Sequence, residues 1–277
     1  MKTIVTHISP DLDAIAACWL IKKFLPHWQH AEIFFVPAGK TFNDLSPDSE
    51  PNVVHVDTGM GKFDHHQSDN DTSATKLVFQ YLLNDSRIKN KEIPALERIV
   101  EFVNLTDNFE EVHFPEPTSD IYDFALHQQI RGLKAKLQSD TKLVEFVFTL
   151  LDAELLFFKN KVNAEEEIKK GLVLKTRFGK TLFLESGNSE AIKLGLKSNF
   201  ALVVQREPSH GYIRIKSLPL KKLNLTNLYI KLLKLDPKAT WYLHPSNNII
   251  LNGSYSNPKT KPSTLTLKKI IALVSEM

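Results

Sequence analysis

The first half of the chain alternates short apolar runs with longer segments of helical periodicity. Runs of apolar and β-branched residues predict strands at Lys2–Thr6, Ile33–Val36 and Val53–Val56. The second and third runs lack a polar–apolar alternation, which is typical of parallel strands that are covered on both faces. These three runs therefore predict a buried parallel sheet.

Apolar residues at helical spacing predict three helices between and after the strands. They extend from Ala14 to Leu25, from Ser73 to Leu83, and from Pro94 to about Asp107. Pro26 ends the first helix, and Pro94 is a residue favoured in a first helical turn. Strands that alternate with helices predict an α/β fold for this half.

The second half of the chain has a different pattern. Thr141–Lys170 predicts one long helix, apolar as far as Phe158 and charged afterwards, and Gly171 ends it. Further strands and helices are then predicted at Leu172–Thr176, Thr181–Leu184, Ser189–Leu196 (helix), Leu202–Gln205, Tyr212–Lys216 and Leu265–Val274 (helix). We therefore expect an α/β domain at residues 1–140, a connecting helix at 141–171, and a smaller α/β or α+β domain at 172–277.

Length and composition agree with two globular domains. The chain has 277 residues, of which 42% are hydrophobic. Its single cysteine, Cys18, excludes a disulfide framework and a cysteine-built zinc ribbon. No secretion signal is visible, and the most apolar window, Leu143–Phe158, is short for a bilayer and contains three acidic residues. We expect a soluble cytoplasmic protein without a membrane partner.

Charge is distributed unequally between the two halves. Residues 161–277 contain 20 basic and 8 acidic side chains, a net charge of +12, which leaves −9 on residues 1–160. An acidic region can hold cations, and a basic region can hold an anionic substrate such as nucleic acid. A solvated, lysine-rich surface is the alternative explanation for the basic half.

Acidic residues and histidines recur at the predicted ends of elements in the first half. His7 ends the first strand, Asp57 ends the third, and loops at the carboxyl ends of parallel strands meet at one crevice. The full candidate set is His7, Asp11, Asp13, Asp57, Asp64, His65, His66 and Asp107. Converging carboxylates repel one another unless cations neutralise them, and carboxylates with imidazoles suit divalent ions. The set is large enough for two ions that share a carboxylate, a chemistry typical of phosphoester hydrolysis.

Each candidate also has a purely structural explanation. Asp11 could cap the following helix, and Asp57, which precedes a glycine turn, could be a turn former. His65 and His66 could be surface residues, and Asp107 could belong to a plain turn at the helix end. Asp13 is harder to explain in this way, because Asp11 already supplies one helix cap. The order and placement of the set, more than any member, indicate a metal site.

The candidate segments resemble the four motifs of the DHH phosphoesterase superfamily, which includes RecJ-type exonucleases, oligoribonucleases and family II pyrophosphatases. The resemblance covers about residues 1–110. It rests on four segments in order: Thr6-His7-Ile-Ser-Pro-Asp11-Leu-Asp13-Ala14, Val56-Asp57, Asp64-His65-His66 and Thr106-Asp107.

This resemblance implies a site with two Mn²⁺ ions, for which Mg²⁺ or Co²⁺ are alternatives. The implied ligands are His7, Asp11, Asp13, Asp57 as the bridging carboxylate, His65 and Asp107. The resemblance further implies that His66 faces the scissile phosphate and that Asp64 orients His65 or the loop.

Two features depart from the common pattern. Asp64 follows Asp57 by only seven positions, and Gln67 follows the two histidines, which resembles a subgroup with a short link before an Asp-His-His-Gln motif. The Gly-Gly-rich, histidine-containing signature of the usual second domain has no clean copy. The candidate substrate-binding residues of the second half are Arg206, Arg214, His244 and Asn252, each of which could equally be an ordinary surface or turn residue.

These observations predict a metal-dependent phosphoesterase that hydrolyses nucleotides or short single-stranded oligonucleotides, with the basic domain closing over the substrate. One alternative is a phosphatase or pyrophosphatase acting on a small phosphorylated molecule. Another is a nucleotide-binding module without turnover. A homodimer is possible, and the sequence does not decide between DNA and RNA.

Overall fold

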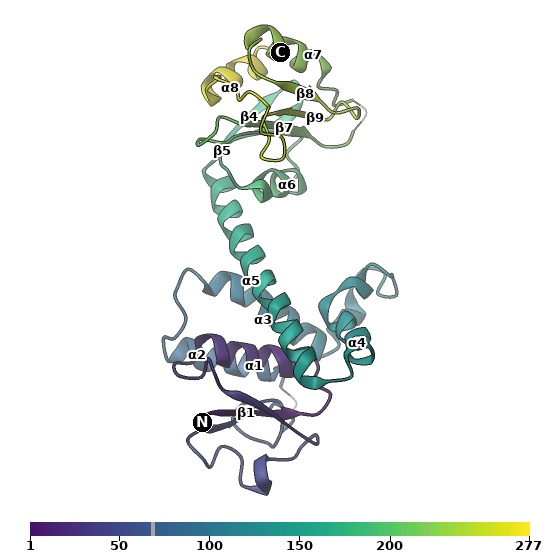
Figure 1. The fold of residues 1–277 in the computed structure, drawn as a ribbon. Coiled ribbons are helices and arrows are strands. Elements are labelled where there is room, and N and C mark those ends of the chain that lie inside the picture. Colours follow the sequence, from purple (N-terminus) through teal and green to yellow (C-terminus); the bar gives the residue numbers. More distant parts are fainter. Residues whose placement is uncertain (68–69, 221) are drawn as a thin grey trace. The chain divides into compact units, whose positions relative to one another are not determined.

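A computed structural model describes residues 1–67, 70–220 and 222–277 and divides the chain into two compact units, Met1–Lys159 and Asn160–Met277 (Figure 1). The first unit contains a three-stranded parallel sheet in the order β2-β1-β3. Its strands are β1 (Thr3–His7), β2 (Glu32–Val36) and β3 (Val53–His55). All three carboxyl ends therefore lie at one edge of the sheet.

Three helices pack together beside this sheet. They are α1 (Leu12–Phe24), α2 (Ala74–Asn84) and α3 (Ile93–Asp107). Every residue of α1 from Leu12 to Ile21 is buried, because the helix is covered on all sides. The Asp11 carboxylate accepts a 3.0 Å hydrogen bond from the Ala14 amide and so caps α1 directly after the end of β1.

The chain returns to the sheet edge after β3. The amide of Asp57 donates to the carbonyl of Phe63 (2.9 Å), and Val56 forms a bridge with Phe63. This pairing closes the intervening residues into a loop. Gly59 allows its tight packing, since it has a φ of +77° and an added Cβ would lie 2.9 Å from Thr41 Cγ2. The segment after the loop is thereby held at the carboxyl edge of the sheet.

Shorter helical segments and one long helix complete the first unit. Single 3₁₀ turns lie at Phe42–Asp44, Glu110–His113 and Tyr122–Phe124. The helices α4 (Leu126–Leu137) and α5 (Asp140–Lys170) follow. Asp152 of α5 accepts a hydrogen bond from Trp19 of α1, whereas Ala164, further along α5, is buried in the core of the second unit. No helix within the described ranges has both the length and the apolar character needed to cross a membrane.

The second unit is built on a six-stranded mixed sheet in the order β4-β5-β6-β7-β9-β8. Only β5 and β6 pair in parallel; the other neighbours are antiparallel. One face packs against α6 and the end of α5, and the other against α7 and α8. The elements are β4 (Leu172–Thr176), β5 (Gly179–Glu185), α6 (Ser189–Lys197), β6 (Leu202–Arg206), β7 (Ile213–Ser217), α7 (Thr226–Leu235), β8 (Trp241–Leu243), β9 (Ile249–Asn252) and α8 (Leu267–Ser275).

The predicted α/β class is confirmed, with a parallel sheet in the first unit and a mixed sheet in the second. Four elements were not predicted. The helix α4 buries only Ile130, so its apolar stripe is weak, and α7 buries only Leu228 and Leu232. The strands β8 and β9 have three and four residues, which is too few for a recognisable period.

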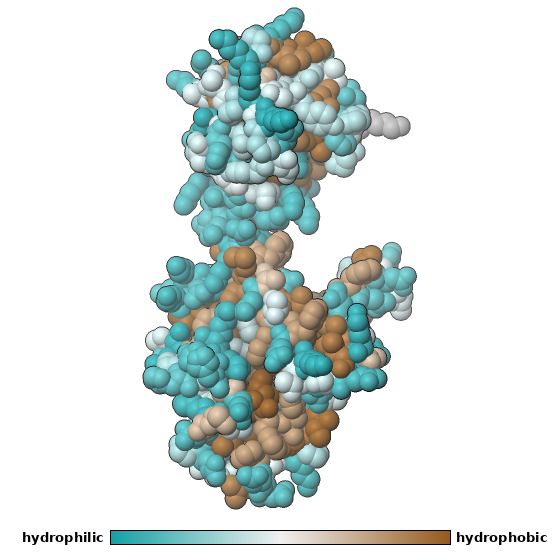
Figure 2. Space-filling model, in the orientation of Figure 1, coloured by the Kyte–Doolittle hydropathy of each residue, from teal (hydrophilic) through white to brown (hydrophobic). Residues whose placement is uncertain are grey.

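The surface of the first unit also carries apolar groups. Figure 2 shows hydrophobic residues gathered on the visible face of this unit. Its exposed large hydrophobic side chains include Phe34 on the edge strand β2 and Leu156 and Phe157 on α5. Exposed apolar residues are common on folded proteins, and these carry no functional assignment here.

Candidate metal centre

His7 presents one ring nitrogen to the carboxyl edge of the sheet. Its Nδ1 lies 2.9 Å from the carbonyl oxygen of Ile8, to which it donates in the neutral tautomer that leaves Nε2 free. Nε2 lies 3.2 Å from Oδ2 of Asp57. A backbone carbonyl that fixes one nitrogen while the other faces carboxylates is the arrangement expected of a histidine metal ligand.

Asp57 is the central carboxylate of the cluster. It lies two residues after the end of β3, is 4% exposed and has a left-handed φ of 54°, a conformation that aspartate tolerates better than most residues. Its Oδ1 is 3.4 Å from His65 Nε2 and 3.7 Å from His66 Nδ1. The ends of β1 and β3 and the loop after Phe63 therefore meet at this side chain.

A second group forms around His65. Its Nε2 lies 3.4 Å from Oδ2 of Asp107, the last residue of α3, and 3.9 Å from Oδ2 of Asp13 on α1. Asp13 is buried, and its two carboxylate oxygens also accept hydrogen bonds from the amides of Ala74 (2.7 Å) and Thr75 (2.8 Å) at the start of α2. Asp13 thus reaches both the cluster and the first turn of another helix.

Asp64 contacts the ring of His66 rather than that of His65. Its Oδ1 lies 2.7 Å from His66 Nδ1, and its Oδ2 accepts a 2.7 Å hydrogen bond from the Met60 amide. Asp64 therefore contacts the loop at Met60, and the imidazole that it contacts is that of His66. With Nδ1 engaged and the side chain 56% exposed, the ring of His66 keeps Nε2 for a ligand.

The six predicted ligands, together with His66, form overlapping groups. The ligand atoms of three sets lie within 4.8 Å of one another: His7–Asp11–Asp57, Asp57–His65–His66 and Asp13–His65–Asp107. Asp57 belongs to two of the sets, and His65 also belongs to two. Asp57 and His65 therefore link the three sets into one cluster that could bind divalent metal.

The hydrogen bonding of the cluster fits such cations. Asp57 Oδ1 and Asp107 Oδ2 are buried and have no hydrogen-bond partner within the described residues. His65 Nε2 is 3.4 Å from each of them, and a single ring nitrogen cannot satisfy two carboxylates. Buried anionic oxygens without donors are costly, and a divalent ion would satisfy both.

The pKa values of the metal-free cluster express the same crowding. Burial, followed by the charge of a neighbouring aspartate, raises the pKa of Asp107 to about 7 and that of Asp13 to about 6. The contact with Asp57, opposed by burial, raises the pKa of His65 to about 9. Burial disfavours the charge of Asp57 itself, but His65 and His7 outweigh it and hold its pKa well below the usual range. The cluster therefore retains protons that divalent ions would displace.

A cavity of about 400 Å³ opens over these residues. It is lined by His7, Asp11, Ala38, Gly39, Asp57, Thr58, Met60, Asp64, His65, His66 and Asp107. The predicted ligands are thus accessible to a substrate, apart from Asp13, which lies behind them.

The sequence matches the model of the family described as "ChrB, C-terminal domain" over residues 4–158, more than half of the chain. The chain belongs to this family. The match includes all six predicted ligands. It does not identify the chain as a member of the DHH superfamily, and that resemblance stays a prediction. A comparison with the curated proteins found no match.

Solved structures similar to this chain include two DHH-type proteins at low identity. One is the DHH domain of a protein described as a member of a family of ribosomal proteins. The two sequences are 11% identical, the match covers 99% of this chain and 86% of the solved one, and the TM-score is 0.33. The other is RecJ from Thermus thermophilus in complex with Mg²⁺. The two sequences are 12% identical, the match covers 99% of this chain and 49% of the RecJ chain, and the TM-score is 0.31.

The candidate substrate residues of the second unit are not gathered in the same way. Arg206 donates to the carbonyl of Leu265 and lies 3.3 Å from Glu185, Arg214 is half-buried on β7, and exposed His244 contacts Ser246. The buried amide of Asn252 donates to the carbonyls of Thr240 and Lys261 and accepts from the Ser263 amide. Asn252 serves the local fold, and we do not include it in the proposed function.

Four lining residues are not among the predicted site residues. Ala38 and Gly39 follow β2, and Thr58 and Met60 lie in the loop after Asp57. The Thr58 hydroxyl accepts from the Gly39 amide (3.2 Å) and donates to the Lys40 carbonyl (3.1 Å), so it ties the two loops together. The available signal was the predicted strand Ile33–Val36, whose following loop had to reach the same sheet edge as the loops after β1 and β3.

Proposed function

We propose that this protein is a metal-dependent phosphoesterase that hydrolyses phosphodiester bonds in nucleotides or short single-stranded oligonucleotides. The observation that carries the proposal is the pair of ligand groups that meet at Asp57, one containing His7 and Asp11 and the other His65 with Asp13 and Asp107. Paired cation sites that share a carboxylate are typical of enzymes that act on phosphate esters.

Two divalent ions are proposed at this cluster, Mn²⁺ first and Mg²⁺ or Co²⁺ as alternatives. When bound, they would supply Lewis-acid polarisation of the phosphoryl oxygens and a lowered pKa for the attacking water. The protein residues hold this arrangement in place. His7 is fixed by the Ile8 carbonyl, and Asp13 is fixed by the amides of α2, so little reorganisation is needed at these ligands.

His66 is proposed as the catalytic residue that contacts the substrate. Asp64 accepts the hydrogen of its Nδ1 and so fixes the orientation of the ring, and when the ring is protonated its Nε2–H can donate to a non-bridging phosphoryl oxygen. Gln67 donates to the carbonyls of Gly61 (2.9 Å) and Asp64 (3.3 Å) and so closes the loop that carries His66. In this proposal Asp64 and Gln67 are positioning residues.

The substrate class is proposed from charge. The net charge of +12 on residues 161–277 favours an extended polyanion, which releases more counterions on binding than a small phosphate ester does. Arg206 and Arg214 lie on neighbouring strands of the second unit, β6 and β7, where Arg214 is paired in register with Gln205. They remain the proposed phosphate contacts of that unit, together with exposed His244.

The test is a hydrolysis assay with Mn²⁺ on a short single-stranded oligonucleotide, a phosphomonoester and pyrophosphate. We expect turnover of the oligonucleotide, a loss of at least about 100-fold in Asp57→Asn and His65→Ala, and unchanged activity in the exposed control Asp123→Asn. Preferential turnover of pyrophosphate or the phosphomonoester would replace the proposed substrate class. Full activity in both cluster variants would overturn the proposal itself.

A further inference from the structure

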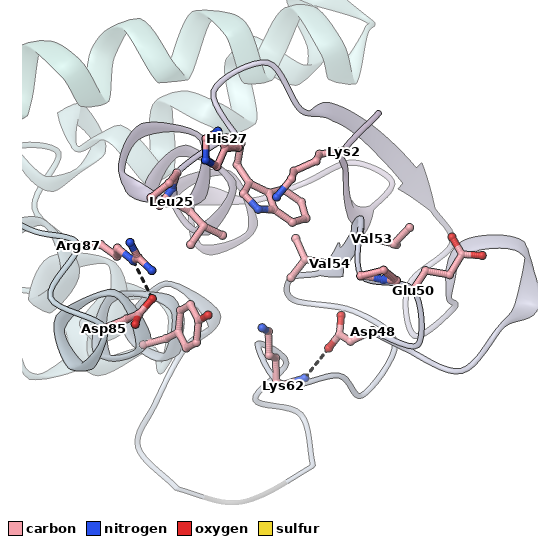
Figure 3. A pocket seen from close by; sticks show the side chains of 14 residues that line it. Lys2, Leu25, His27, Asp48, Glu50, Val53, Val54, Lys62, Asp85 and Arg87 are labelled. Carbon is pink, nitrogen blue, oxygen red and sulfur yellow. Dashed lines mark hydrogen bonds and ion pairs between the residues drawn. The ribbon is translucent and has the colours of Figure 1, made fainter.

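A second cavity lies at the opposite edge of the three-stranded sheet, where the strands begin (Figure 3). Its volume is about 430 Å³. Lys2 and Val53 come from the starts of β1 and β3, Trp28 from the segment after α1, and Tyr81 from α2. It shares no lining residue with the cavity at the metal centre. The two cavities are therefore separate sites on the first unit.

Two lysines point into this cavity from facing walls (Figure 3). Lys2 Nζ lies 4.5 Å from the ring centroid of Trp28, and Lys62 Nζ lies 4.6 Å from that of Tyr81. Among the described residues, neither ammonium group has a carboxylate within ion-pair distance. Aromatic faces hold a cation in place without neutralising it, so both charges stay available to an anion.

The acidic residues around the cavity are not paired with these lysines. Asp85 is paired with Arg87 at 2.7 Å. Asp48 accepts hydrogen bonds from the amides of His55 (2.9 Å) and Lys62 (3.0 Å). Glu50 is exposed. Among the described residues, none of the three carboxylates forms an ion pair with Lys2 or Lys62, whose ammonium groups lie against aromatic rings instead.

Part of the wall is apolar or aromatic. Besides the rings of Trp28 and Tyr81, the side chains of Leu25, Pro26 and Val54 line the cavity. Convergent polar groups beside an apolar and aromatic surface can bind a small organic molecule that has both a charged and an apolar part, and the volume lies within the usual range for such ligands.

We propose that this cavity binds a small anion in which a phosphate group is joined to a flat ring, as in a nucleoside 5′-monophosphate. The phosphate lies between the ammonium groups of Lys2 and Lys62, and the ring packs against the aromatic and apolar wall. The site requires neither the metal ions nor the proposed hydrolysis.

The experiment is isothermal titration of the full chain with adenosine 5′-monophosphate in EDTA, which removes ions from the metal centre. We expect saturable binding that Lys2→Met with Lys62→Met weakens at least about tenfold. The matched control pair, Lys89→Met with Lys91→Met, removes the same charge from exposed lysines outside the cavity and should leave binding unchanged. Inorganic phosphate and adenosine should each bind more weakly than the monophosphate.

Absence of saturable binding in EDTA would overturn the proposal. Equal affinity in the cavity variant and the unsubstituted chain, or an equal loss in the control pair, would overturn it as well. Binding of adenosine or of inorganic phosphate as tight as that of the monophosphate would contradict the joint recognition of phosphate and ring. None of these outcomes depends on catalytic turnover, so a failure here is distinguishable from a failure of the proposed phosphoesterase activity.

Discussion

Asp13 and Thr75 hold each other through two hydrogen bonds. The Asp13 carboxylate accepts from the Thr75 amide at 2.8 Å, and the Thr75 hydroxyl donates to the Asp13 carbonyl at 2.9 Å. Both residues are buried, and they lie on α1 and α2, 62 positions apart in the chain. Asp13, a carboxylate of the candidate metal centre, therefore also connects the core helices α1 and α2 through hydrogen bonds.

Replacing Asp13 should destabilise the protein even without metal. Asp13→Ala leaves two buried amides at the start of α2 without an acceptor, which costs about 2–4 kcal/mol of unfolding free energy. Asp11→Ala removes only a helix cap and should cost about 1 kcal/mol. Urea unfolding in EDTA measures both. If Asp13→Ala lowered the unfolding free energy by no more than Asp11→Ala does, the structural role of Asp13 would be contradicted.

Replacing Asp107 should have the opposite effect on the metal-free protein. Burial and the charge of Asp13 raise the pKa of Asp107 to about 7, so its ionised form opposes folding above that pH. Asp107→Asn should therefore raise the unfolding free energy at pH 8 in EDTA by about 1 kcal/mol or more. The same variant should lose most of the stabilisation gained with Mn²⁺, which thermal unfolding with and without the ion detects.

The metal-free protein should lose stability between pH 6 and pH 9. Burial raises the pKa of Asp13 to about 6 and that of Asp107 to about 7, so both carboxyls cost stability as the pH rises from 3.8 to these values, and of the two only Asp107 adds to the loss above pH 6. Burial lowers the pKa of His7, but the contact with Asp57 outweighs this effect and raises the pKa to about 9. Contact with Asp57 also raises the pKa of His65 to about 9. The stabilisation from both histidines is complete below their unfolded pKa of 6.5 and is lost as the pH rises through about 9.

Melting temperatures in EDTA at pH 6, 7.5 and 9 test this trend. Saturating Mn²⁺ should flatten or reverse it, because the ions bind the deprotonated ligands and bind more tightly as pH rises. A metal-free melting temperature that rises steadily over this range would contradict the assigned protonation of the cluster.

Gly59 and Gly39 form a matched pair for testing the loops at the sheet edge. Both have a left-handed φ, +77° and +75°, but a Cβ on Gly59 would lie 2.9 Å from Thr41 Cγ2, whereas a Cβ on Gly39 meets nothing within 4 Å. Gly39→Ala should cost about 1 kcal/mol from backbone strain alone. Gly59→Ala should cost more and also weaken metal binding, because it displaces the loop that leads to His65. Calorimetric unfolding and Mn²⁺ titration compare the two.

His66 should affect turnover without affecting metal content. His66→Ala should lower kcat about 100-fold while the purified protein keeps its ions, since the side chain is 56% exposed and Asp64 holds it. Asp64→Asn should also lower kcat, because it weakens the contact that holds the ring of His66 in place. The control is His113→Ala, a histidine whose side chain is 77% exposed and which lies outside the cavity. A loss of bound metal in His66→Ala would make this residue a ligand instead.

The sequence by itself was sufficient for the main elements of the first unit. Its strands are short, apolar and β-branched, and α1 to α3 have clear periodicity, so the parallel sheet could be predicted from local pattern. The same patterns place His7 and Asp57 at strand ends, where parallel topology alone directs them to one edge. The helix α4 and the strands β8 and β9 could not be predicted, because their burial depends on neighbours rather than on a strong pattern of their own.

Only the tertiary structure decided which of these side chains meet and what holds them. Asp64 pairs with His66 rather than with His65 because the bridge between Val56 and Phe63 fixes the path of the loop. Asp13 reaches the amides of α2, and Lys2 and Lys62 share a cavity, through contacts across about sixty residues of chain. Local preferences specify strands, helices and turns, whereas contacts between distant segments depend on how those elements pack, which no short window of sequence contains.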